Sequence, residues 1–442
     1  MFSPKKRVFL LKESFMHPRL KGCLERAMCV ELMTLKEVAR LQEEKLKALL
    51  GYAAEKVPFY RAYFAAHGVD PARVGIKDFP IIDKQDIRNH EKDFIADDFA
   101  VGKLASTRTS GSTGEPFLFY RGKNEWDDSY ACLWRGLFRL GIEMGDKRAF
   151  IKGVDERPNV SLATRMKRWC YGILNRCIVI DAHFLAISEA NVLSAIRRLR
   201  RYRPAYLHGY VSSIDLLAAT AGRLGLRLDD IGLKVIVTES EKLHDFQRER
   251  ISRLFGCRVV ENYGCVEFGM IAQPDAEGNC CINDDHVYVE TDEDGAAIYT
   301  NLDARAFPLI RFRNGDRIRL RKEKRSRLPY REMESVDGRV AETIRLPQGG
   351  ELQGYIVMYP ISKHMRYLRE YQVYQPDINH LLIRVVEAEK LPVKVEKQIL
   401  HEMHTIVGDR INLEIKKVES IPLTKRGKRT FVCSDVKEKD LA

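Results

Sequence analysis

The sequence predicts an α/β protein with a large N-terminal α/β domain, containing parallel sheets and a small β-subdomain, followed by a small α+β C-terminal domain. From residue 148 onward, short apolar segments alternate with helical ones, which is typical of a parallel sheet covered by helices. Period-two alternation takes over at residues 282–320, and a strand–helix–strand pattern follows residue 341. Since 442 residues exceed one ordinary core, we predict domains at 1–340 and 341–442.

The first part of the chain, residues 18–90, is predicted to be helical. Apolar residues recur at helical spacing through ELMTLKEVARLQEEKLKALLGYAAEK, and Pro58 ends this pattern. The segment TRTSGSTGEP at 107–116 then leads into a short alternating strand, FLFYR. A helix with aromatic residues on its core face is predicted from Asn124 to Gly141.

Five strands and three helices are expected in the alternating region. The strands are RAFIKG, CIVI, AYLHGY, KVIVTES and RVVENYG, and the helices lie at 188–202, 212–225 and 242–255. Polar clusters end three of the strands, at residues 208–210, 238–241 and 261–264. Because ligands of open parallel sheets bind at the carboxyl ends of the strands, we expect a binding site there.

Strands of an antiparallel subdomain are predicted next, at HVYVE, AAIYT, LIRFR and DRIRL. The Asn-Gly-Asp sequence places Asp316 at a turn between the last two of them. In the C-terminal domain, YQVYQPDINHLLIRVVEAEK and RINLEIKKVES are expected to form strands that flank a helix at 392–407.

The composition is that of a soluble globular protein, with 45% hydrophobic and 31% charged residues. No uncharged apolar run reaches the roughly 18 residues that span a bilayer. The N-terminal apolar run VFLL is too short for the core of a signal peptide, so we expect a cytoplasmic protein.

The ten cysteines are scattered and contain no C-x-x-C pair, which favours free thiols in a reducing compartment. A structural zinc site is left open as an alternative. Its ligands would be drawn from Cys257, Cys265, Cys280, Cys281 and His286, although their spacing differs from the known zinc signatures.

The net charge of +12 points to an anionic partner. The basic residues are dispersed, and no RRM, KH or helix-turn-helix signature is present, so no nucleic-acid partner is expected. The segment MKRWCYGILNRC at 166–177 carries basic and aromatic faces, so peripheral membrane contact is one alternative and an ordinary surface helix is the simpler one. The sequence does not indicate an oligomeric state.

The Ser/Thr/Gly segment at 107–116 is the first candidate for chemistry. Small side chains let its backbone approach a polyanion closely, and its N–H and hydroxyl groups supply hydrogen-bond donors. Arg108 and Arg121 are nearby cations that would favour phosphate. No lysine follows Gly114, unlike in a P-loop, so a lysine is expected from elsewhere in the chain. A flexible linker is the alternative.

Four more segments follow this loop in order, and they are ENYGCVEFG (261–269), LIRFRNGDRIRL (309–320), VDGRV (336–340) and IPLTKRGKRTFV (421–432). Together the five segments resemble the adenylate-forming (ANL) superfamily, and more narrowly its phenylacetate–CoA ligase and CapK-like branch. That branch has segments similar to QEEKLKALLGYAAEKVPFYR, PIIDKQDIRNH, TSGSTGEP and IPLTKRGKR of this chain. The resemblance covers nearly the whole chain.

The resemblance implies a ligase that activates a carboxylic acid with ATP and Mg²⁺, releasing pyrophosphate and forming an acyl-adenylate. The C-terminal domain would then rotate so that a thiol acceptor, such as CoA, takes the acyl group. A carrier-protein thiol or an amine on an amino sugar is the alternative acceptor, since CapK-like relatives are tied to surface-polysaccharide pathways. The remaining alternative is a non-catalytic protein that binds nucleic acid or membranes.

The resemblance also assigns roles to individual residues. The β- and γ-phosphates of ATP would be held by Thr109, Ser110, Gly111, Ser112, Thr113 and Gly114. The adenine would lie along Ser240, Glu241, Asn262, Tyr263 and Gly264, whose aromatic member suits stacking.

The other implied roles concern metal, ribose and chemistry. Glu267 would help bind Mg²⁺, Asp316 would accept the ribose hydroxyls, and Arg339 would contact the ribose or a phosphate. Lys428, the lysine that the loop lacks, would contact the α-phosphate and the attacking carboxylate, so Lys428 and Glu267 are the predicted catalytic residues. The substrate pocket would include His208 and Tyr210.

Structural roles are open for several of these residues. Tyr263 and His208 could be core residues, Glu267 an acid at a helix N-terminus, Asp316 a turn residue and Lys428 an exposed basic residue. The chain also departs from its relatives at two places. Val340, Ala341 and Glu342 follow Arg339 where many relatives have paired aspartates near the hinge, and 238–241 (TESE) adds a carboxylate to the adenine wall.

Overall fold

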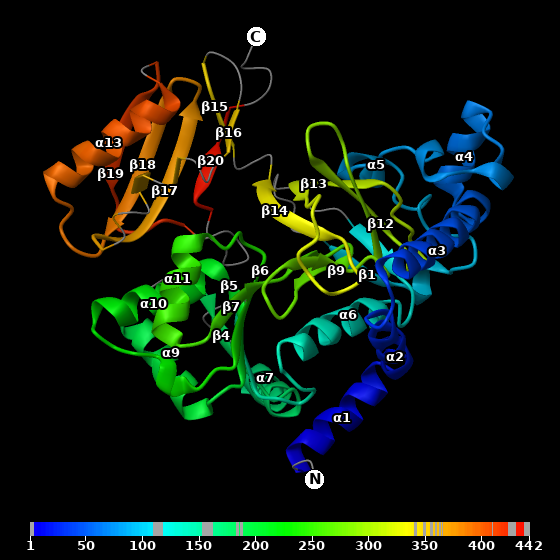
Figure 1. Cartoon of the computed structure of the whole chain (residues 1–442), viewed down its shortest axis with the longest axis horizontal. Coiled ribbons are helices and arrows are strands. Elements are labelled where there is room, and N and C mark those ends of the chain that lie inside the picture. Colours follow the sequence, from blue (N-terminus) through cyan, green and yellow to red (C-terminus); the bar gives the residue numbers. More distant parts are fainter. Residues whose placement is uncertain are drawn as a thin grey trace. The chain divides into compact units, whose positions relative to one another are not determined.

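The computed structural model describes residues 4–108, 118–152, 162–182, 185, 189–339, 343–347, 351–353, 357–358, 360–361, 364, 366–408, 410–422 and 430–436 (Figure 1). The chain divides into two compact units that alternate along the sequence. The first unit comprises Met1–Arg148, Met166–Cys177 and Val260–Val336, and the second comprises Ala149–Arg165, Ile178–Val259 and Asp337–Ala442. The predicted division at residue 340 stays a prediction.

The N-terminal region is helical, as the apolar spacing predicts. Its helices are α1 (Pro4–Met16), α2 (Leu20–Val30), α3 (Leu35–Lys56), α4 (Pro58–His67) and α5 (Lys84–Asn89). A capping box between Thr34 and Glu37 begins α3, because each residue satisfies a backbone N–H that the helix leaves unpaired. Pro58 occupies the first position of α4, where its missing N–H costs nothing, so α3 ends before it.

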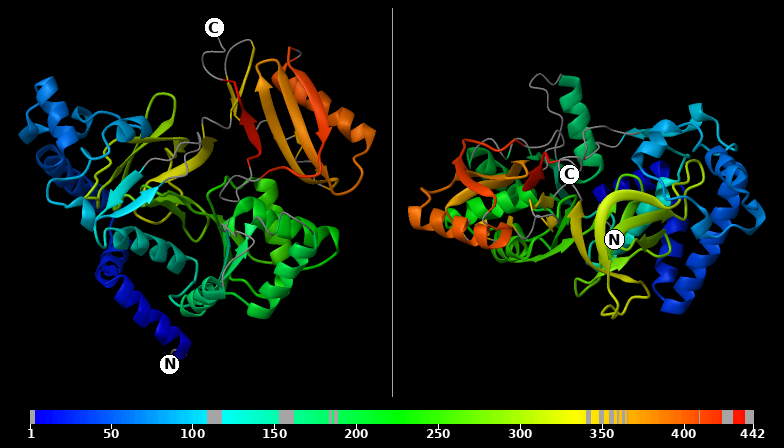
Figure 2. Two further views of the ribbon diagram at one scale, coloured as in Figure 1. Left: turned by 180° about the vertical axis from the view of Figure 1, so that it is seen from behind. Right: turned by 90° about the horizontal axis from the view of Figure 1, so that it is seen from above.

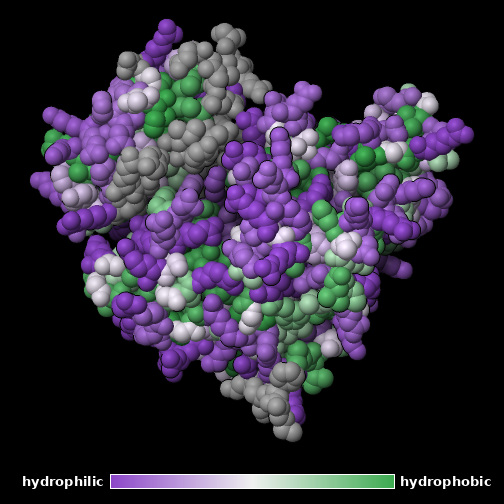
Figure 3. All heavy atoms as spheres, viewed as in Figure 1, coloured by the Kyte–Doolittle hydropathy of each residue, from purple (hydrophilic) through white to green (hydrophobic). Residues whose placement is uncertain are grey.

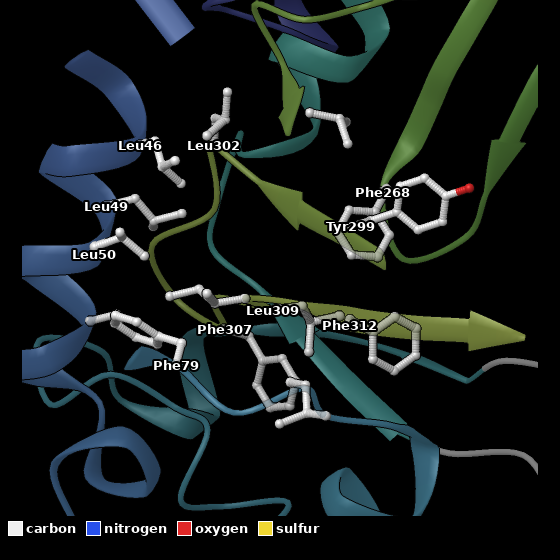
Figure 4. Close-up of a cluster of buried hydrophobic side chains, with 14 of the residues drawn as sticks. Leu46, Leu49, Leu50, Phe79, Phe268, Tyr299, Leu302, Phe307, Leu309 and Phe312 are labelled. Atoms are coloured by element: carbon white, nitrogen blue, oxygen red, sulfur yellow. The ribbon is translucent and has the colours of Figure 1, made fainter. Parts of the chain in front are cut away.

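An antiparallel sheet forms the centre of the first unit. Its strands are β8 (Tyr263–Cys265), β9 (Gly269–Pro274), β10 (Cys280–Ile282), β11 (Val287–Thr291), β12 (Ala296–Asn301), β13 (Phe312–Leu320) and β14 (Glu332–Arg339). They lie in the order β11-β12-β13-β14-β10-β9-β8. Side chains of α3 pack into one core with Phe268, Tyr299 and Phe312 of this region (Figure 4). Beside this sheet lie the short hairpin of β1 (Ala105–Arg108) and β2 (Leu118–Arg121), and helix α6 (Trp126–Arg139).

The turn predicted at Asp316 is wrong, because β13 runs without interruption through this position. In its pairing with β12, the three residues Asn314, Gly315 and Asp316 oppose the single residue Ala297. Gly315 has φ = 91°, so the Asn-Gly-Asp sequence forms a bulge rather than a chain reversal. Both structures need a residue at positive φ, which is why the local sequence does not distinguish them.

The predicted parallel sheet with covering helices is confirmed in the second unit. Its strands are β3 (Arg148–Lys152), β4 (Cys177–Asp181), β5 (Tyr206–Tyr210), β6 (Val235–Glu239) and β7 (Arg258–Glu261), in the order β4-β3-β5-β6-β7. Strands β5 and β6 are parallel. Helices α9 (Glu189–Tyr202), α10 (Val211–Arg223) and α11 (Asp245–Phe255) lie together on one face (Figure 2). Their apolar residues share one core with this sheet.

The C-terminal residues form a small α+β structure with its own core, as predicted. Strands β17 (Leu368–Asp377), β18 (His380–Glu387), β19 (Asn412–Lys417) and β20 (Val432–Ser434) form a sheet in the order β19-β18-β17-β20. Helix α13 (Val393–Val407) packs on this sheet, and β15 (Thr343–Arg345) pairs with β16 (Glu351–Gln353).

All ten cysteines are unpaired thiols. Among the described residues, no helix is both long enough and apolar enough to cross a bilayer.

A buried ion pair joins α6 to the central sheet. Arg135 is fully buried, and its guanidinium donates to both carboxylate oxygens of Asp285 at 2.8 Å. It also donates to Asn283 Oδ1 and to the carbonyl of Ala27. Burial alone would raise the pKa of Asp285, but the nearby positive charge of Arg135 lowers it.

We predict that Arg135→Met lowers the free energy of unfolding by about 3–5 kcal/mol, because it leaves the Asp285 carboxylate buried without its counter-charge. Urea denaturation measures the change. The control is Arg40→Met, which breaks an exposed pair with Glu44 and should cost less than about 0.5 kcal/mol. Equal losses in the two variants would contradict the assigned importance of the buried pair.

Candidate active site

In the first unit, the candidate site is built on the hairpin of β8 and β9. Tyr263 lies on β8, and Glu267 lies in the turn that joins the two strands. Gly269 has φ = 70°, and a Cβ there would lie 1.8 Å from Ser129 Oγ of α6. The hairpin can therefore pack closely on α6 only with glycine at this position, which fixes where Glu267 lies. The alternative of Glu267 as an acid at a helix N-terminus is wrong.

Tyr263 and Asp316 are brought together from β8 and the β13 bulge. The Tyr263 hydroxyl donates to Asp316 Oδ2 at 2.7 Å and lies 2.8 Å from the hydroxyl of fully buried Tyr299. Asn314 also donates to Asp316 Oδ2 at 2.7 Å, and its own Oδ1 accepts from the Asp316 backbone N–H. The bulge thus turns the Asp316 carboxylate, only 7% exposed, toward Tyr263.

The charge state of this network follows from its burial. Burial and the nearby Asp316 carboxylate raise the pKa of Tyr263 well above its usual range. Tyr263 is therefore neutral at physiological pH, which is the state that can donate to a carboxylate. Its ring packs against the main core of the first unit, so it has both the structural and the polar role that the sequence left open.

Glu267 lines a recess together with Arg121, Glu125, Trp126 and Ser129. The Arg121 guanidinium lies 3.9 Å from the centre of the Trp126 ring and donates to the carbonyl of Val266. Burial lowers the pKa of Arg121 to about 10, against the opposing effect of Glu267, so Arg121 stays a cation at neutral pH. The recess therefore holds the Arg121 cation together with the carboxylates of Glu267 and Glu125.

Arg121 was noted in the sequence only as a cation near the Ser/Thr/Gly loop. Its importance depends on Trp126 and Glu267, which are close in space but are not related to Arg121 by any local motif. The one signal in the sequence is position, since Arg121 ends the strand that follows the loop.

His286 supports the hairpin from the other side. Its Nδ1 lies 2.6 Å from Asp303 Oδ2, and its Nε2 lies 3.0 Å from the carbonyl of Phe268, next to Glu267. Lys45 donates to the other oxygen of Asp303 at 2.5 Å. Together, His286 and Lys45 hold the pKa of Asp303 well below its usual range, although burial alone would raise it.

The open alternative of a structural zinc site receives no support. Within the part of the chain that the structure describes, no three His, Cys, Asp or Glu side chains lie close enough to share a metal ion. His286 already contacts Asp303 and the carbonyl of Phe268. Zinc binds the thiolate form of cysteine, and burial opposes this form because it raises the pKa of the Cys257, Cys265, Cys280 and Cys281 thiols.

Mg²⁺ is usually bound by one or two carboxylates together with substrate phosphates, so Glu267 alone is a suitable protein ligand.

In the second unit, polar residues gather at the carboxyl ends of β5 and β6, as expected for a parallel sheet. His208 Nε2 lies 2.9 Å from Glu239 Oε2, and its ring stacks on Phe150 with ring centres 4.9 Å apart. His208 is only 7% exposed, so its contacts are mainly with neighbouring side chains and not with water. Tyr210 ends β5 and is the residue before α10, where it is 8% exposed.

Glu241 binds the N-terminus of α10. Its two carboxylate oxygens accept from the backbone N–H of Ser212 at 2.7 Å and from the Ser212 hydroxyl at 3.0 Å. A carboxylate is stabilised there by the unpaired N–H groups and the helix dipole. Ser240 has φ = 70°, a left-handed conformation that favours glycine, and it directs the chain from β6 toward this contact.

For the remaining predicted site residues, the structure shows only the position in the fold or does not describe them. Asn262 is buried between β7 and β8, and Gly264 is part of β8. Arg339 ends β14, and its side chain is outside the described part. Residues 109–114 and Lys428 also lie outside the described residues.

We predict that Tyr263→Phe lowers the free energy of unfolding by about 1.5–3 kcal/mol, because it removes a hydrogen bond to a buried carboxylate. Urea denaturation measures this loss. The control is Tyr288→Phe on β11, which removes a half-buried hydroxyl that makes no hydrogen bond to any described residue. A loss in Tyr263→Phe no larger than in the control would show that the Asp316 contact does not stabilise the fold.

Comparison with known proteins gives one consistent family. The model of the CapK C-terminal domain matches residues 348–435. Protein CapK of Staphylococcus aureus is 24% identical over 420 residues, covering 91% of this chain and 90% of CapK. The phenylacetate–coenzyme A ligase of Escherichia coli is 26% identical over 434 residues, covering 89% of this chain and 91% of that enzyme.

The solved structures agree on the fold. A 2-hydroxyisobutyryl-CoA ligase, crystallised in the postadenylation state with an acyl-AMP, matches with a TM-score of 0.71 at 18% identity, covering 96% of this chain and 92% of that one. The two sequence relatives and this structural match cover 89–96% of the chain rather than one motif. The chain is therefore homologous to CapK and to the phenylacetate–coenzyme A ligases, and it has the fold of the adenylate-forming ligases.

Proposed function

We propose that this protein activates a carboxylic acid with ATP, forming an acyl-adenylate and pyrophosphate, and then transfers the acyl group to a thiol acceptor such as CoA. The observation that carries the proposal is the hydrogen bond between Tyr263 of β8 and Asp316 of β13, with Glu267 in the turn that directly follows β8. These are the residues to which the family resemblance assigns adenine, ribose and magnesium. Homology to phenylacetate–coenzyme A ligases over about nine-tenths of both chains supports the same reaction.

Asp316 is the proposed ribose-binding group. A carboxylate accepts hydrogen bonds from hydroxyl groups, and a ribose presents two neighbouring hydroxyls. The hydrogen bonds from Tyr263 and Asn314 both reach Oδ2, so they fix the plane of the carboxylate before nucleotide binds. Because the carboxylate is already oriented, less conformational entropy is lost when the nucleotide binds. Tyr263, anchored by its hydroxyl, is then proposed to present its ring to the adenine.

Glu267 and Arg121 are proposed to act on the phosphates. Glu267 is a suitable ligand for Mg²⁺, which would neutralise phosphate charge when bound. Arg121 carries a positive charge in a recess that is largely shielded from water, where its attraction for an anion is stronger than at an exposed surface. The Ser/Thr/Gly loop at 109–114 is proposed to supply backbone donors to the β- and γ-phosphates.

In the second unit, His208 and Tyr210 are proposed to line the pocket for the acid. His208 and Tyr210 end β5, where an open parallel sheet binds ligands. Glu239 Oε2 lies 2.9 Å from His208 Nε2, so the proposed pocket contains a pair of polar side chains. Glu241 and Ser240 are assigned to the adenine wall.

Lys428 is proposed to bind the α-phosphate and the attacking carboxylate during adenylate formation. A positive charge at this point offsets the negative charge that develops as the carboxylate oxygen bonds to phosphorus and pyrophosphate leaves. The C-terminal domain would then rotate and withdraw Lys428 before thiol attack. Arg339 is proposed to contact the ribose or a phosphate.

The acceptor has a second candidate. The C-terminal match is to the CapK domain, so a carrier-protein thiol or an amine on an amino sugar is proposed beside CoA. Supplying CoA, a phosphopantetheinylated carrier protein or an amino sugar to the preformed acyl-adenylate distinguishes the three by the product.

We predict that Lys428→Ala reduces acid-dependent ATP–pyrophosphate exchange by at least about 100-fold while ATP affinity changes little, because the lysine acts mainly in the transition state. Exchange is measured with labelled pyrophosphate, Mg²⁺ and a panel of aryl, fatty, hydroxy and amino acids. The matched control is Lys425→Ala in the same basic segment, which should exchange at the wild-type rate.

Undiminished exchange in Lys428→Ala would reject its catalytic role. If no acid in the panel supports exchange by the wild-type protein, the proposed activity fails for these acid classes.

A further inference from the structure

Exposed hydrophobic side chains are concentrated on two helices of the first unit, α1 and α7 (Leu162–Leu174). Of the sixteen large hydrophobic side chains that are exposed in the described structure, nine lie on these helices. They are Val8, Leu11, Phe15, Met16, Met166, Trp169, Tyr171, Ile173 and Leu174, and we call them the α1/α7 surface. Single exposed hydrophobic residues are ordinary, but a cluster of this kind marks an interaction surface.

Helix α1 is apolar on two opposite faces. Phe9 and Glu13 are buried on the inner face, where Phe9 makes an edge contact with Trp134 of α6. Leu11 and Phe15, four residues apart on the outer face, are 72% and 85% exposed. Large apolar side chains on the face of a helix that points away from its own core are typical of an interaction surface. The outer face of α1 is therefore suited to a further partner. Part of it is visible as green spheres beside the N-terminus in Figure 3.

Helix α7 has one apolar stripe at helical spacing. Met166, Trp169 and Ile173 follow one another at intervals of three and four residues, so they share one face. They are 58%, 67% and 51% exposed. A hydrogen bond of 2.6 Å from Lys12 Nζ of α1 to Asn175 Oδ1, directly after α7, joins the two helices. The stripe and the outer face of α1 thus belong to neighbouring elements.

The sequence segments that form this surface are rich in basic residues. Residues 157–180 contain five basic residues and no acidic one. Residues 1–16 contain four basic residues and one acid, Glu13. Lys6 pairs with Glu143 and Lys12 pairs with Glu13, so part of this positive charge is balanced. Two copies of this chain would repel each other at such a surface, whereas an anionic lipid bilayer would attract it.

We propose that the α1/α7 surface docks this protein peripherally on an anionic membrane, with Trp169, Phe15 and Leu11 inserted at the boundary between headgroups and acyl chains. Tryptophan prefers this boundary because its ring is apolar and its N–H is polar. The basic residues would contact the lipid phosphates, as in other amphipathic helices that lie in the membrane surface. The sequence left this role open for residues 166–177, and the exposure of α1 and α7 now favours it.

Flotation of the full-length protein with lipid vesicles tests the proposal. Binding is expected to vesicles of phosphatidylcholine and phosphatidylglycerol, with weak binding to phosphatidylcholine alone and a loss of binding as salt is raised. Trp169 is exposed and Trp134 is buried, so vesicle binding should shift the tryptophan emission to the blue.

Leu11→Glu and Trp169→Glu are each expected to weaken binding to the mixed vesicles by at least about tenfold, because each removes an inserted side chain and adds a repelled charge. Both side chains are exposed, so circular dichroism and gel filtration should match the wild type. The controls are Leu32→Glu and Val393→Glu, at positions that are 88% and 66% exposed outside the α1/α7 surface, and these should bind normally.

Absence of binding to the mixed vesicles would overturn the proposal, as would equal losses in the test and control variants. Concentration-dependent dimers that Leu11→Glu and Trp169→Glu disrupt, with no vesicle binding, would assign the surface to a second copy instead. Since pyrophosphate exchange needs no membrane, its failure would reject the proposed reaction without affecting this result.

Discussion

The hydrogen bond between the Tyr263 hydroxyl and Asp316 Oδ2 is the interaction on which the candidate nucleotide site of the first unit depends. It connects β8 to the bulge of β13 and fixes the carboxylate that we propose as the ribose acceptor. Each partner is held by a second group, Tyr263 by Tyr299 and Asp316 by Asn314. A small polar network with every member bonded is rigid, because no side chain can turn without leaving a buried polar atom unpaired.

The surroundings of this network keep the hairpin in place. His286, with Asp303 and Lys45 behind it, holds the backbone carbonyl next to Glu267. Arg135 and Asp285 connect α6, on which the hairpin packs, to the same part of the sheet. These pairs are costly to desolvate, and the hydrogen bonds between their charged groups offset this cost. The hairpin of β8 and β9 is thus held in place by buried charged pairs in the residues around it.

The sequence predicts most elements because their signals are local. Period-two and helical spacing identified β5, β6, α10 and α13, each close to its observed ends. The polar ends of β5 and β6 followed from the rule for parallel sheets alone. Asp316 was placed in a turn because Asn-Gly-Asp permits a turn and a bulge equally, and only pairing with β12 selects the bulge.

Other site features depend on contacts between distant residues. Tyr299 supports Tyr263 across 36 positions, and Ser212 bonds to Glu241 across 29, so neither pair forms a local motif. Arg121 acquires its role only from Trp126 and the turn at Val266. The roles of Tyr263, Asp316 and Glu267 were implied by family resemblance, since their spacing alone also allows a core aromatic residue, a turn residue and an acid at a helix N-terminus.

The central claim is that the Tyr263–Asp316 network presents a ribose acceptor. A double-mutant cycle tests it directly, with calorimetric binding of AMP and 2′,3′-dideoxy-AMP to the wild-type protein and to Asp316→Ala. Because the two ligands are compared on each folded protein, changes in stability cancel. The account predicts a coupling free energy of about 1.5–3 kcal/mol between the carboxylate and the ribose hydroxyls, as for hydrogen bonds to a charged group. A coupling near zero, with the dideoxy ligand weakened equally on both proteins, would contradict it.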